Sequence, residues 1–477
     1  MKNTIILLAF LLLGSSVAFA QWQPYGQTLT GENDGDRFGN DIELSGNGKT
    51  LVIGVADSPD FGIGSETNSN AGKIEVYEFV NDSWAQLGSD IDGGTTANLF
   101  GIKVAISGNG LVIAGAGGSE QPFTTTRIFE FVNNDWVQKG NAIQNLNQID
   151  NVKNLSLNED GSIVAIGSTG RNGGEKLGAV AIYKFENNDW QLLGAPVYGD
   201  ENGDNFGLEV DLTSDGMRFV SGALGNDENG DNTGVARVYA FNGSSWVQVG
   251  TDIFGDNTFD RLGSNVSINN LGDRIAIVAA FSGSNNRVDV YENNNGNWQQ
   301  LGNSIFKPST PNLPSSALNG AGDIIVIGAP SEPLLRILKF NGSSWNQINE
   351  SSIGGGVSEI AIDDTGGIVG AGSPMFPLPG QVTFFVDPTL GVEDFEESSS
   401  KFLLYPNPSS GVVTFESLDE PILSFSVFST NGYLVKSERT LLNHHKCKVD
   451  LTDLAKGMYF VILTTSSHNY NAKIILK

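Results

Sequence analysis

WVQVGTDI, residues 246–253, decides the fold, because the chain contains four close copies of these eight letters. The copies are WAQLGSDI at 84–91, WVQKGNAI at 136–143, WQLLGAPV at 190–197 and WQQLGNSI at 298–305. All seven tryptophans follow one another at intervals of 47 to 62 residues: Trp22, Trp84, Trp136, Trp190, Trp246, Trp298 and Trp345. Repeats of this length that contain several short strands are typical of propeller blades.

The pattern within one repeat predicts four strands. In residues 206–253, FGLEVDLTSDG alternates and then turns, and MRFVSGA is a short apolar strand. VARVYAFNGSS alternates and turns again before WVQVGTDI. Four strands per unit is the arrangement of a propeller blade, and residues 38–91 repeat the same order.

The two ends of the repeat region complete each other. WQPYGQTL at 22–29 is a tryptophan strand without preceding strands, and residues 354–388 contain three strands without a tryptophan strand after them. Six continuous blades and one blade built from both termini give seven, with residues 22–29 beside Gln381 to Asp387. Each tryptophan strand is then the outer strand of its blade, and its Trp and the Gly four residues later, absent only after Trp345, repeat because blade packing repeats.

Composition supports an all-β protein whose main domain covers residues 21–388. The 60 glycines suit short strands joined by turns, and the net charge of −27 disfavours nucleic acid and anionic membranes as partners. Divalent cations and cationic or neutral ligands fit this charge better, although it also serves solubility alone. Because Cys447 is the single cysteine, no disulfide forms within the chain. We expect a monomer.

The first twenty residues predict a secretory signal peptide. Lys2 precedes an apolar run from Ile5 to Leu13, and Ala18-Phe19-Ala20 is a cleavage pattern that places the mature start at Gln21. The run is too short to span a bilayer as a helix. An uncleaved anchor is the alternative.

The strand pairs of the repeat resemble a known family. FG at 38, 100 and 206, with Leu262-Gly263 in the same place, is followed by VIGVADSP, VIAGAGG, FVSGALG and VIGAPSEP. This pattern is similar to the FG-GAP repeat of integrin α-subunit propellers and bacterial surface proteins. The calcium loop of that family is reduced here to turns such as SGNGK, so the resemblance implies the fold and no integrin-type calcium site.

Acidic loops precede three of these strands, as ENDGDRFG at 32, DENGDNFG at 200 and DNTFDRLG at 256, and a second DENGD lies at 227–231. Strand alternation places them on one face of the disc. Their spacing of oxygen ligands suits calcium, and plain Asn/Asp/Gly turn chemistry is the alternative. The candidate ligands are Asp34, Asp36, Asp200, Asn202, Asp204, Asp227, Asn229, Asp231, Asp256 and Asp260.

The main domain is not expected to be an enzyme. It contains neither histidine nor cysteine, since His444, His445 and His468 all lie near the C-terminus, and this excludes Ser-His-Asp and Cys-His catalysis there. A carboxylate-dependent glycan hydrolase, with Asp204 and Asp231 as an example pair, is the alternative. The Asp-box of sialidase propellers does not occur.

The C-terminal region predicts a separate small sandwich. LGVEDFEESSSK reads as a linker over 389–401, and residues 402–477 contain alternating strands that indicate an immunoglobulin-like β-sandwich. YPNP (Tyr405, Pro406, Asn407 and Pro408), Asn431-Gly432, and Gly457, Met458 and Tyr459 in LAKGMYFV are similar to the type A sorting domain of the type IX secretion system. The resemblance implies passage through the outer membrane; a sandwich without an export role is the alternative.

Together these patterns predict a protein delivered to the cell surface or the medium by type IX secretion, with a non-catalytic, adhesion-type propeller that binds a glycan or a protein. No cofactor is expected except calcium on the acidic loops. A structural surface scaffold remains a further alternative.

Overall fold

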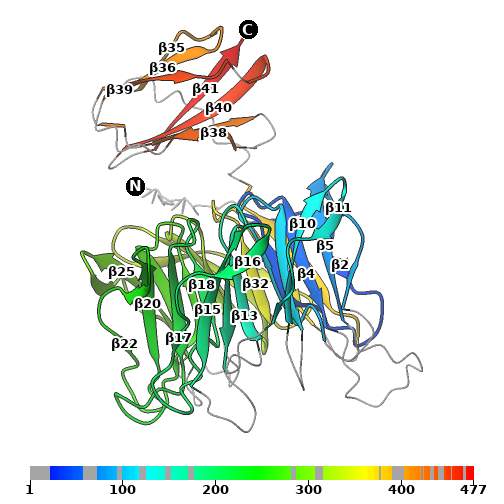
Figure 1. Ribbon diagram of the computed structural model, residues 1–477, viewed down its shortest axis with the longest axis vertical. Helices are drawn as coiled ribbons and strands as arrows, with labels where there is room; N and C mark the ends of the chain where they lie inside the picture. The colour runs from blue at the N-terminus through cyan, green and yellow to red at the C-terminus, as the bar shows by residue number, and fades with distance from the viewer. Residues whose placement is uncertain are drawn as a thin grey trace, which may run out of the picture. The chain divides into compact units, whose positions relative to one another are not determined.

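The computed structural model describes most of the chain, and the regular elements of the described part are all β-strands (Figure 1). The described residues are 22–56, 72–93, 99–117, 125–144, 152–169, 177–280, 286–306, 315–374, 378–388, 402–418, 421–422, 424–429, 434–438, 445–452, 454–465 and 469–477. The chain divides into two compact units, Met1–Pro388 and Thr389–Lys477. The predicted cleavage site and the predicted linker lie outside the described residues. Within the described residues, no helix is long and apolar enough to cross a membrane.

The first unit contains, in its described residues, seven antiparallel sheets. In six of them the strands are β3 (Phe38–Leu44), β4 (Thr50–Val55), β5 (Lys73–Val80), β6 (Ser83–Gln86) and β7 (Ile91–Asp92); β8 (Lys103–Ile106), β9 (Val112–Gly117), β10 (Thr125–Val132), β11 (Asp135–Gln138) and β12 (Ile143–Gln144); β13 (Val152–Leu157), β14 (Ile163–Ser168), β15 (Ala179–Glu186), β16 (Asp189–Leu192) and β17 (Val197–Tyr198); β18 (Val210–Leu212), β19 (Arg218–Ala223), β20 (Val235–Phe241), β21 (Trp246–Gln248) and β22 (Ile253–Phe254); β23 (Leu262–Ile268), β24 (Arg274–Ala279), β25 (Arg287–Asn294), β26 (Asn297–Gln300) and β27 (Ile305–Phe306); and β28 (Ser315–Leu318), β29 (Ile324–Ala329), β30 (Glu332–Phe340) and β31 (Trp345–Ser352). The seventh sheet combines β32 (Glu359–Ile362), β33 (Ile368–Ser373) and β34 (Gln381–Val386) with β1 (Gln23–Pro24) and β2 (Leu29–Thr30).

The first strands of the seven sheets meet in a closed ring. These inner strands are β3, β8, β13, β18, β23, β28 and β32; each contacts the next, and β32 contacts β3. The hairpin turns that follow them are also linked: Asp364 N–H donates to the Gly46 carbonyl at 2.9 Å, and Gly46 N–H donates to the Gly108 carbonyl at 2.8 Å. The arrangement is propeller-like, with one strand of each sheet facing the centre.

The chain ends of the first unit pair as predicted. In the seventh sheet, Gln23 lies opposite Val386 and Leu29 lies opposite Val382. Trp22 and Leu29 are buried, and Val382 is fully covered. The N-terminal strands therefore complete a sheet whose other three strands come from residues 359–386, and they cover the edge of β34.

The tryptophan repeat is a contact between neighbouring sheets. The Trp136 indole N–H donates to the Leu87 carbonyl of the preceding sheet at 2.8 Å, and a Cβ on Gly88 would lie 2.8 Å from the Trp136 ring. Gly88 has a φ of 76°. Glycine therefore recurs four residues after Trp because the next indole occupies the place of its side chain.

The prediction of one continuous strand per copy is wrong in one respect. WVQVGTDI is divided into β21 and β22, which both pair with β20, because the chain turns at Gly250. After Trp345, where the glycine is missing, the strand continues unbroken to Ser352. The outer position of these strands is confirmed, since each ends its sheet.

The phenylalanines and glycines of the FG-type pairs lie at close contacts between adjacent sheets. Phe38, Phe100 and Phe206 are at most 2 % exposed. A Cβ on Gly101 would lie 2.4 Å from the Lys73 carbonyl oxygen, and one on Gly54 would lie 2.0 Å from the Gly101 carbonyl oxygen. The small residues of the repeat thus let backbones of adjacent sheets touch.

The second unit has two sheets around its own apolar core. One contains β35 (Phe402–Tyr405), β36 (Val412–Ser417) and β39 (Lys446–Asp450), and the other contains β37 (Ser424–Ser429), β38 (Leu434–Glu438), β40 (Gly457–Thr464) and β41 (Asn469–Leu476). Phe415, Phe425 and Leu463 are among its fully buried residues.

Candidate functional site

The aspartates that precede the FG-type strands are buried caps of their own loops. Asp204 is 2 % exposed and its Oδ2 accepts the N–H groups of Asp200 and Glu201, each at 3.0 Å. Asp260 accepts in the same way from Asp256 and Asn257. This bonding is Asx-type turn chemistry, which was the alternative to calcium at these positions.

The corresponding aspartate of the first loop is Asp36. Its carboxylate accepts the N–H groups of Asn33 and Phe38 at 3.0 Å. The Gly31 N–H donates to the Gly380 carbonyl, which ties this loop to the chain between β33 and β34. Asp34, in the same loop, is exposed.

Two arginines neutralise much of the remaining acidity in these loops. Arg237 on β20 pairs with Asp200 at 2.6 Å and with Asp252 at 2.8 Å. Arg287 on β25 pairs with Asp256 at 2.9 Å and Asp260 at 2.8 Å. In two of the four acidic loops, an arginine side chain therefore pairs with candidate calcium ligands: Asp200 in one loop, and Asp256 and Asp260 in the other.

The second DENGD loop bonds mainly with itself and with its neighbour. Asp227 accepts the Asn232 N–H at 2.6 Å, Asn229 donates to the Gly255 carbonyl at 3.2 Å, and the Asp231 carbonyl accepts the Phe259 N–H. The same-face prediction holds for this pair of loops.

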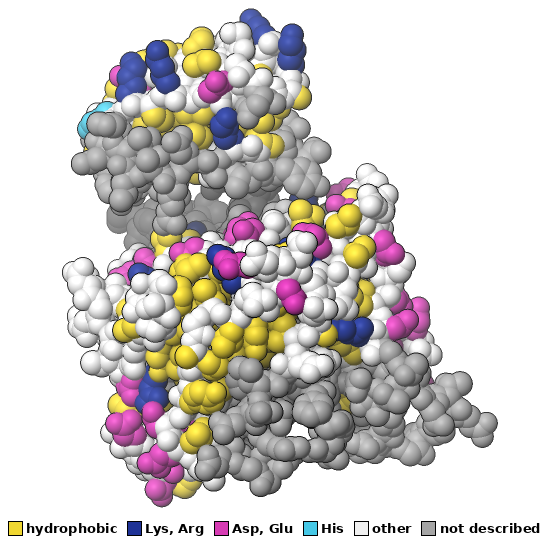
Figure 2. Space-filling model, in the orientation of Figure 1, with side chains coloured by type: hydrophobic (Ala, Val, Ile, Leu, Met, Phe, Trp, Pro, Cys, Tyr) yellow, Lys and Arg dark blue, Asp and Glu magenta, His cyan; other side chains and the backbone are white. Residues whose placement is uncertain are grey.

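No group of three or more acidic, histidine or cysteine side chains that could hold a metal ion occurs among the described residues. Asn202, the remaining candidate ligand, is exposed. Figure 2 shows Asp and Glu scattered over the visible face of the first unit. Calcium binding stays a prediction.

Replacement of Asp204 by alanine is expected to lower the free energy of unfolding by about 2 kcal/mol, because two backbone N–H groups lose their buried acceptor. Urea unfolding of Asp204→Ala measures the effect. The exposed Asp231→Ala is the matched control and should stay within about 0.5 kcal/mol of the parent; equal stability of both variants would contradict the capping role.

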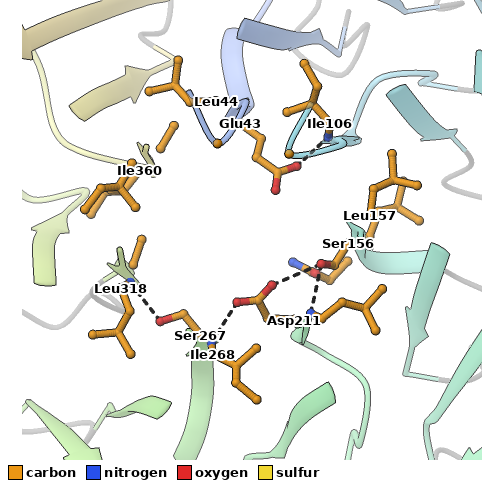
Figure 3. A pocket seen from close by; sticks show the side chains of 18 of the residues that line it. Glu43, Leu44, Ile106, Ser156, Leu157, Asp211, Ser267, Ile268, Leu318 and Ile360 are labelled. Atoms are coloured by element: carbon orange, nitrogen blue, oxygen red, sulfur yellow. Dashed lines mark hydrogen bonds between the residues drawn. The ribbon is translucent and has the colours of Figure 1, made fainter. Parts of the chain in front are cut away.

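The inner strands enclose a polar cavity of about 210 Å³ at the centre of the ring. Figure 3 shows Glu43 and Asp211 extending toward its middle from opposite sides, among backbone from several sheets. Its acidic lining residues are Asp41, Glu43, Glu159, Glu209, Asp211, Glu359, Asp363 and Asp364. We take this cavity as the candidate functional site, since it is a concave space with convergent polar groups.

Side chains in the cavity connect several of the inner strands to the next one. Glu43 accepts the Ile106 N–H at 2.7 Å, and Asp211 accepts the Ile268 N–H at 2.8 Å and the Ser156 hydroxyl at 3.1 Å. The bonds run from sheet to sheet because adjacent inner strands do not form a common ladder. The same groups that line the cavity therefore hold the ring.

A second layer of side chains lies two residues earlier on the same strands. Asp41 accepts the Val104 N–H at 2.6 Å and pairs with Lys103 at 3.1 Å. Asn154 donates to Glu209 at 2.8 Å. Lys103 reaches this layer through its pair with Asp41, whereas the ionisable residues that line the cavity itself are all acidic.

Burial controls the protonation of these groups. It raises the pKa of Glu209 to about 8, that of Glu359 to about 7 and that of Asp211 to about 6. Burial also holds the pKa of Glu43 well above its usual range. Burial opposes the charge on Lys103, but the attraction of Asp41 and other carboxylates outweighs it and raises the pKa of Lys103.

Sequence analysis did not find these residues. A usable signal exists, because carboxylates alternate with apolar residues in DIEL at 41–44 and in LEVDL at 208–212. In a propeller, an acid in the first strand of a repeat lies near the axis. The acids of the loops give a more visible sequence signal for a ligand site, because they lie close together in the chain.

The sorting-type motif of the second unit lies against the last strand. The Asn407 side chain donates to the Lys473 carbonyl at 2.6 Å and accepts the Ile475 N–H at 2.9 Å. The Ser409 N–H donates to the Ile475 carbonyl. YPNP thus covers the free edge of the C-terminal end of β41.

Three of the other motif residues lie on β40. Gly457 and Met458 pair with the C-terminal end of β41. Tyr459 is buried, and its hydroxyl donates to the Ala455 carbonyl. Asn431-Gly432 lies outside the described residues.

Comparison with known proteins supports the prediction of a sorting domain in the C-terminal region. Residues 403–477 match the family described as secretion system C-terminal sorting domain. The chain therefore carries a C-terminal sorting domain of type IX secretion, which implies export to the cell surface or the extracellular space. No curated protein sequence matches the chain. Among solved structures, the chain is similar to Kuenenia stuttgartiensis hydrazine synthase, with 13 % identity, a TM-score of 0.49 and coverage of 75 % of this chain and 97 % of that one.

Proposed function

We propose that residues 21–388 form a closed seven-bladed β-propeller that is exported by type IX secretion and binds a glycan or protein ligand without chemical turnover. The sorting domain supports the export part. Seven sheets, with β1 and β2 completing the last of them, support the blade count. The central cavity is the observation that carries the binding part, because propellers offer ligands the space at their axis.

The charge of the protein defines the ligand class. A net charge of −27 and an acidic cavity repel anions, so the ligand is neutral or cationic at the groups that enter the cavity. A glycan and protein array probed with the mature chain, residues 21–477, tests the proposal. We expect retention without product release. Probing with and without calcium, together with the change in Tm on adding the metal, tests the predicted loop sites.

Matched variants locate the binding. Asp211→Asn should weaken retention, because its side chain extends into the cavity, whereas Asp231→Asn on an exposed loop should not. Retention that is lost with the loop variant and kept with the cavity variant would place the binding site elsewhere. No retention by any ligand would favour the scaffold alternative.

A carboxylate-dependent hydrolase is a second candidate, now at the cavity. Glu209, with a pKa of about 8, is protonated at neutral pH, and other carboxyl groups lie in the same cavity. A neutral acid beside a carboxylate is what glycoside hydrolysis needs. Release of sugar from an array ligand, abolished in Glu209→Gln, would replace binding with hydrolysis as the function.

A further inference from the structure

The ionisable side chains that line the central cavity are all acidic, although some of them also join the inner strands of the ring. Three inner strands, together with the residue just before β18, supply five of its carboxyl groups: Asp41, Glu43, Glu209, Asp211 and Glu359. β23 and β28 contribute uncharged groups such as Asn265, Ser267 and Ser316. We propose that this cavity makes the ring of inner strands pH-sensitive, so that loss of protons from its clustered carboxyl groups, which bridge adjacent sheets, weakens the first unit.

The geometry connects these charges directly to ring closure. Glu43 on β3 accepts from Ile106 of the next sheet, and Asp211 on β18 accepts from Ile268 of the next sheet. Glu209 is bonded to Asn154 of the preceding sheet at 2.8 Å. A change of charge at these positions acts on the contacts between sheets, because each inner strand belongs to a different sheet.

The cations near the cavity do not balance its acids. Lys103 on β8 pairs with Asp41 at 3.1 Å. Burial and then repulsion from Lys103 lower the pKa of Lys153 on β13. At one end of the cavity, the hairpin turns add Glu159, Asp363 and Asp364, and burial raises the pKa of each of these as well. Full ionisation would therefore place several like charges in one small buried space, which is unfavourable.

The direction of the effect follows from proton linkage. Unfolded carboxyl groups lose their protons near pH 4, whereas Asp211, Glu359 and Glu209 retain theirs until about pH 6, 7 and 8 in the folded protein. The folded state thus binds more protons than the unfolded chain across this interval. The stability is fully present below about pH 4 for these groups, falls as the pH rises, and is lost by about pH 8.

Two carboxyl groups outside the cavity have pKa values shifted in the opposite direction. Burial is the largest influence on the pKa values of Asp252 and Asp160 and raises them, but several hydrogen bonds and a nearby cation together outweigh burial and lower both pKa values. Such groups are ionised in both states above about pH 5 and add no slope there. The histidines lie near the C-terminus, outside the first unit.

Thermal unfolding of the mature chain at pH 5.5, 6.5, 7.5 and 8.5 tests the proposal. Tryptophan fluorescence reports on the first unit alone, since all seven tryptophans lie between Trp22 and Trp345. We expect Tm to fall by about 5 °C or more between pH 5.5 and 8.5. A Tm that stays constant or rises over this range would overturn the proposal.

Isosteric variants separate the cavity from the rest of the surface. Glu209→Gln should flatten the fall in Tm by raising Tm at pH 8.5 more than at pH 5.5, and Glu359→Gln should do the same if the first variant fails to fold. Glu201→Gln is the matched control, because Glu201 is exposed in the loop before the same strand. A folded cavity variant that keeps the slope of the parent, or a control that removes it, would also refute the proposal.

Discussion

Removal of residues 402–477 is expected to leave the protein in the periplasm of a host that carries type IX secretion. The deleted residues include the match to the sorting domain and form a unit of their own, so the first unit keeps its fold. The expected result is loss of the exported fraction to background, which fractionation of medium, cell surface and periplasm measures. This is the largest effect that we predict, because the sorting domain is the part of the chain that we connect with passage through the outer membrane.

A complementary fusion controls for folding defects in the truncated chain. An unrelated periplasmic reporter joined to residues 389–477 should reach the surface or the medium. Export of the truncated protein would show that the first unit contains a signal of its own. A stable reporter fusion that stays in the periplasm would show that residues 389–477 are not sufficient.

Deletion of residues 21–30 is expected to open the ring and lower the free energy of unfolding of the first unit by about 5 kcal/mol or more. The deletion removes Trp22 and Leu29, which are 5 % and 8 % exposed, and uncovers the edge of β34. Loss of one buried tryptophan alone costs about 3–5 kcal/mol. Urea unfolding followed by the fluorescence of the six remaining tryptophans measures the change.

Two point variants show whether the effect comes from ring closure. Trp22→Ala should account for much of the loss, whereas Gln23→Ala should change little, because Gln23 is exposed. A deleted chain with the midpoint of the parent would mean that β1 and β2 do not stabilise the seventh sheet.

Much of the fold could be predicted from the sequence because its information is local and repeated. The spacing of Trp84, Trp136 and Trp190 sets the repeat length, and the turns between strands mark the sheets. The unequal fragments at the two ends predicted that residues 22–29 would pair with residues 381–387, and the register Gln23 to Val386 confirms this. The motif Tyr405 to Pro408 predicted the sorting domain for the same reason: it is a contiguous pattern.

The role of the loop aspartates could not be predicted in the same way. Asp36, Asp204 and Asp260 occupy one position in three copies, and this suggested a shared role in binding. The structure gives them a shared role in turns, because their carboxylates accept backbone N–H groups of their own loops. Whether an aspartate side chain faces its backbone or the solvent depends on a loop conformation that sequence spacing does not specify.

By itself, the sequence determined which residues form strands, how the strands group into repeats and which ends join, since hydrophobic period and turn chemistry are properties of short segments. Only the tertiary structure decided why glycine follows tryptophan, because the indole that fills the place beside Gly88 belongs to the next sheet. It also decided that Glu43, Glu209 and Glu359, which are far apart in the chain, share one cavity. Burial, together with the charge of Glu359, therefore raises the pKa of the other two carboxyl groups. The physical reason is that closure of the ring, and not the order of residues, brings the inner strands together and partly shields their carboxyl groups from water.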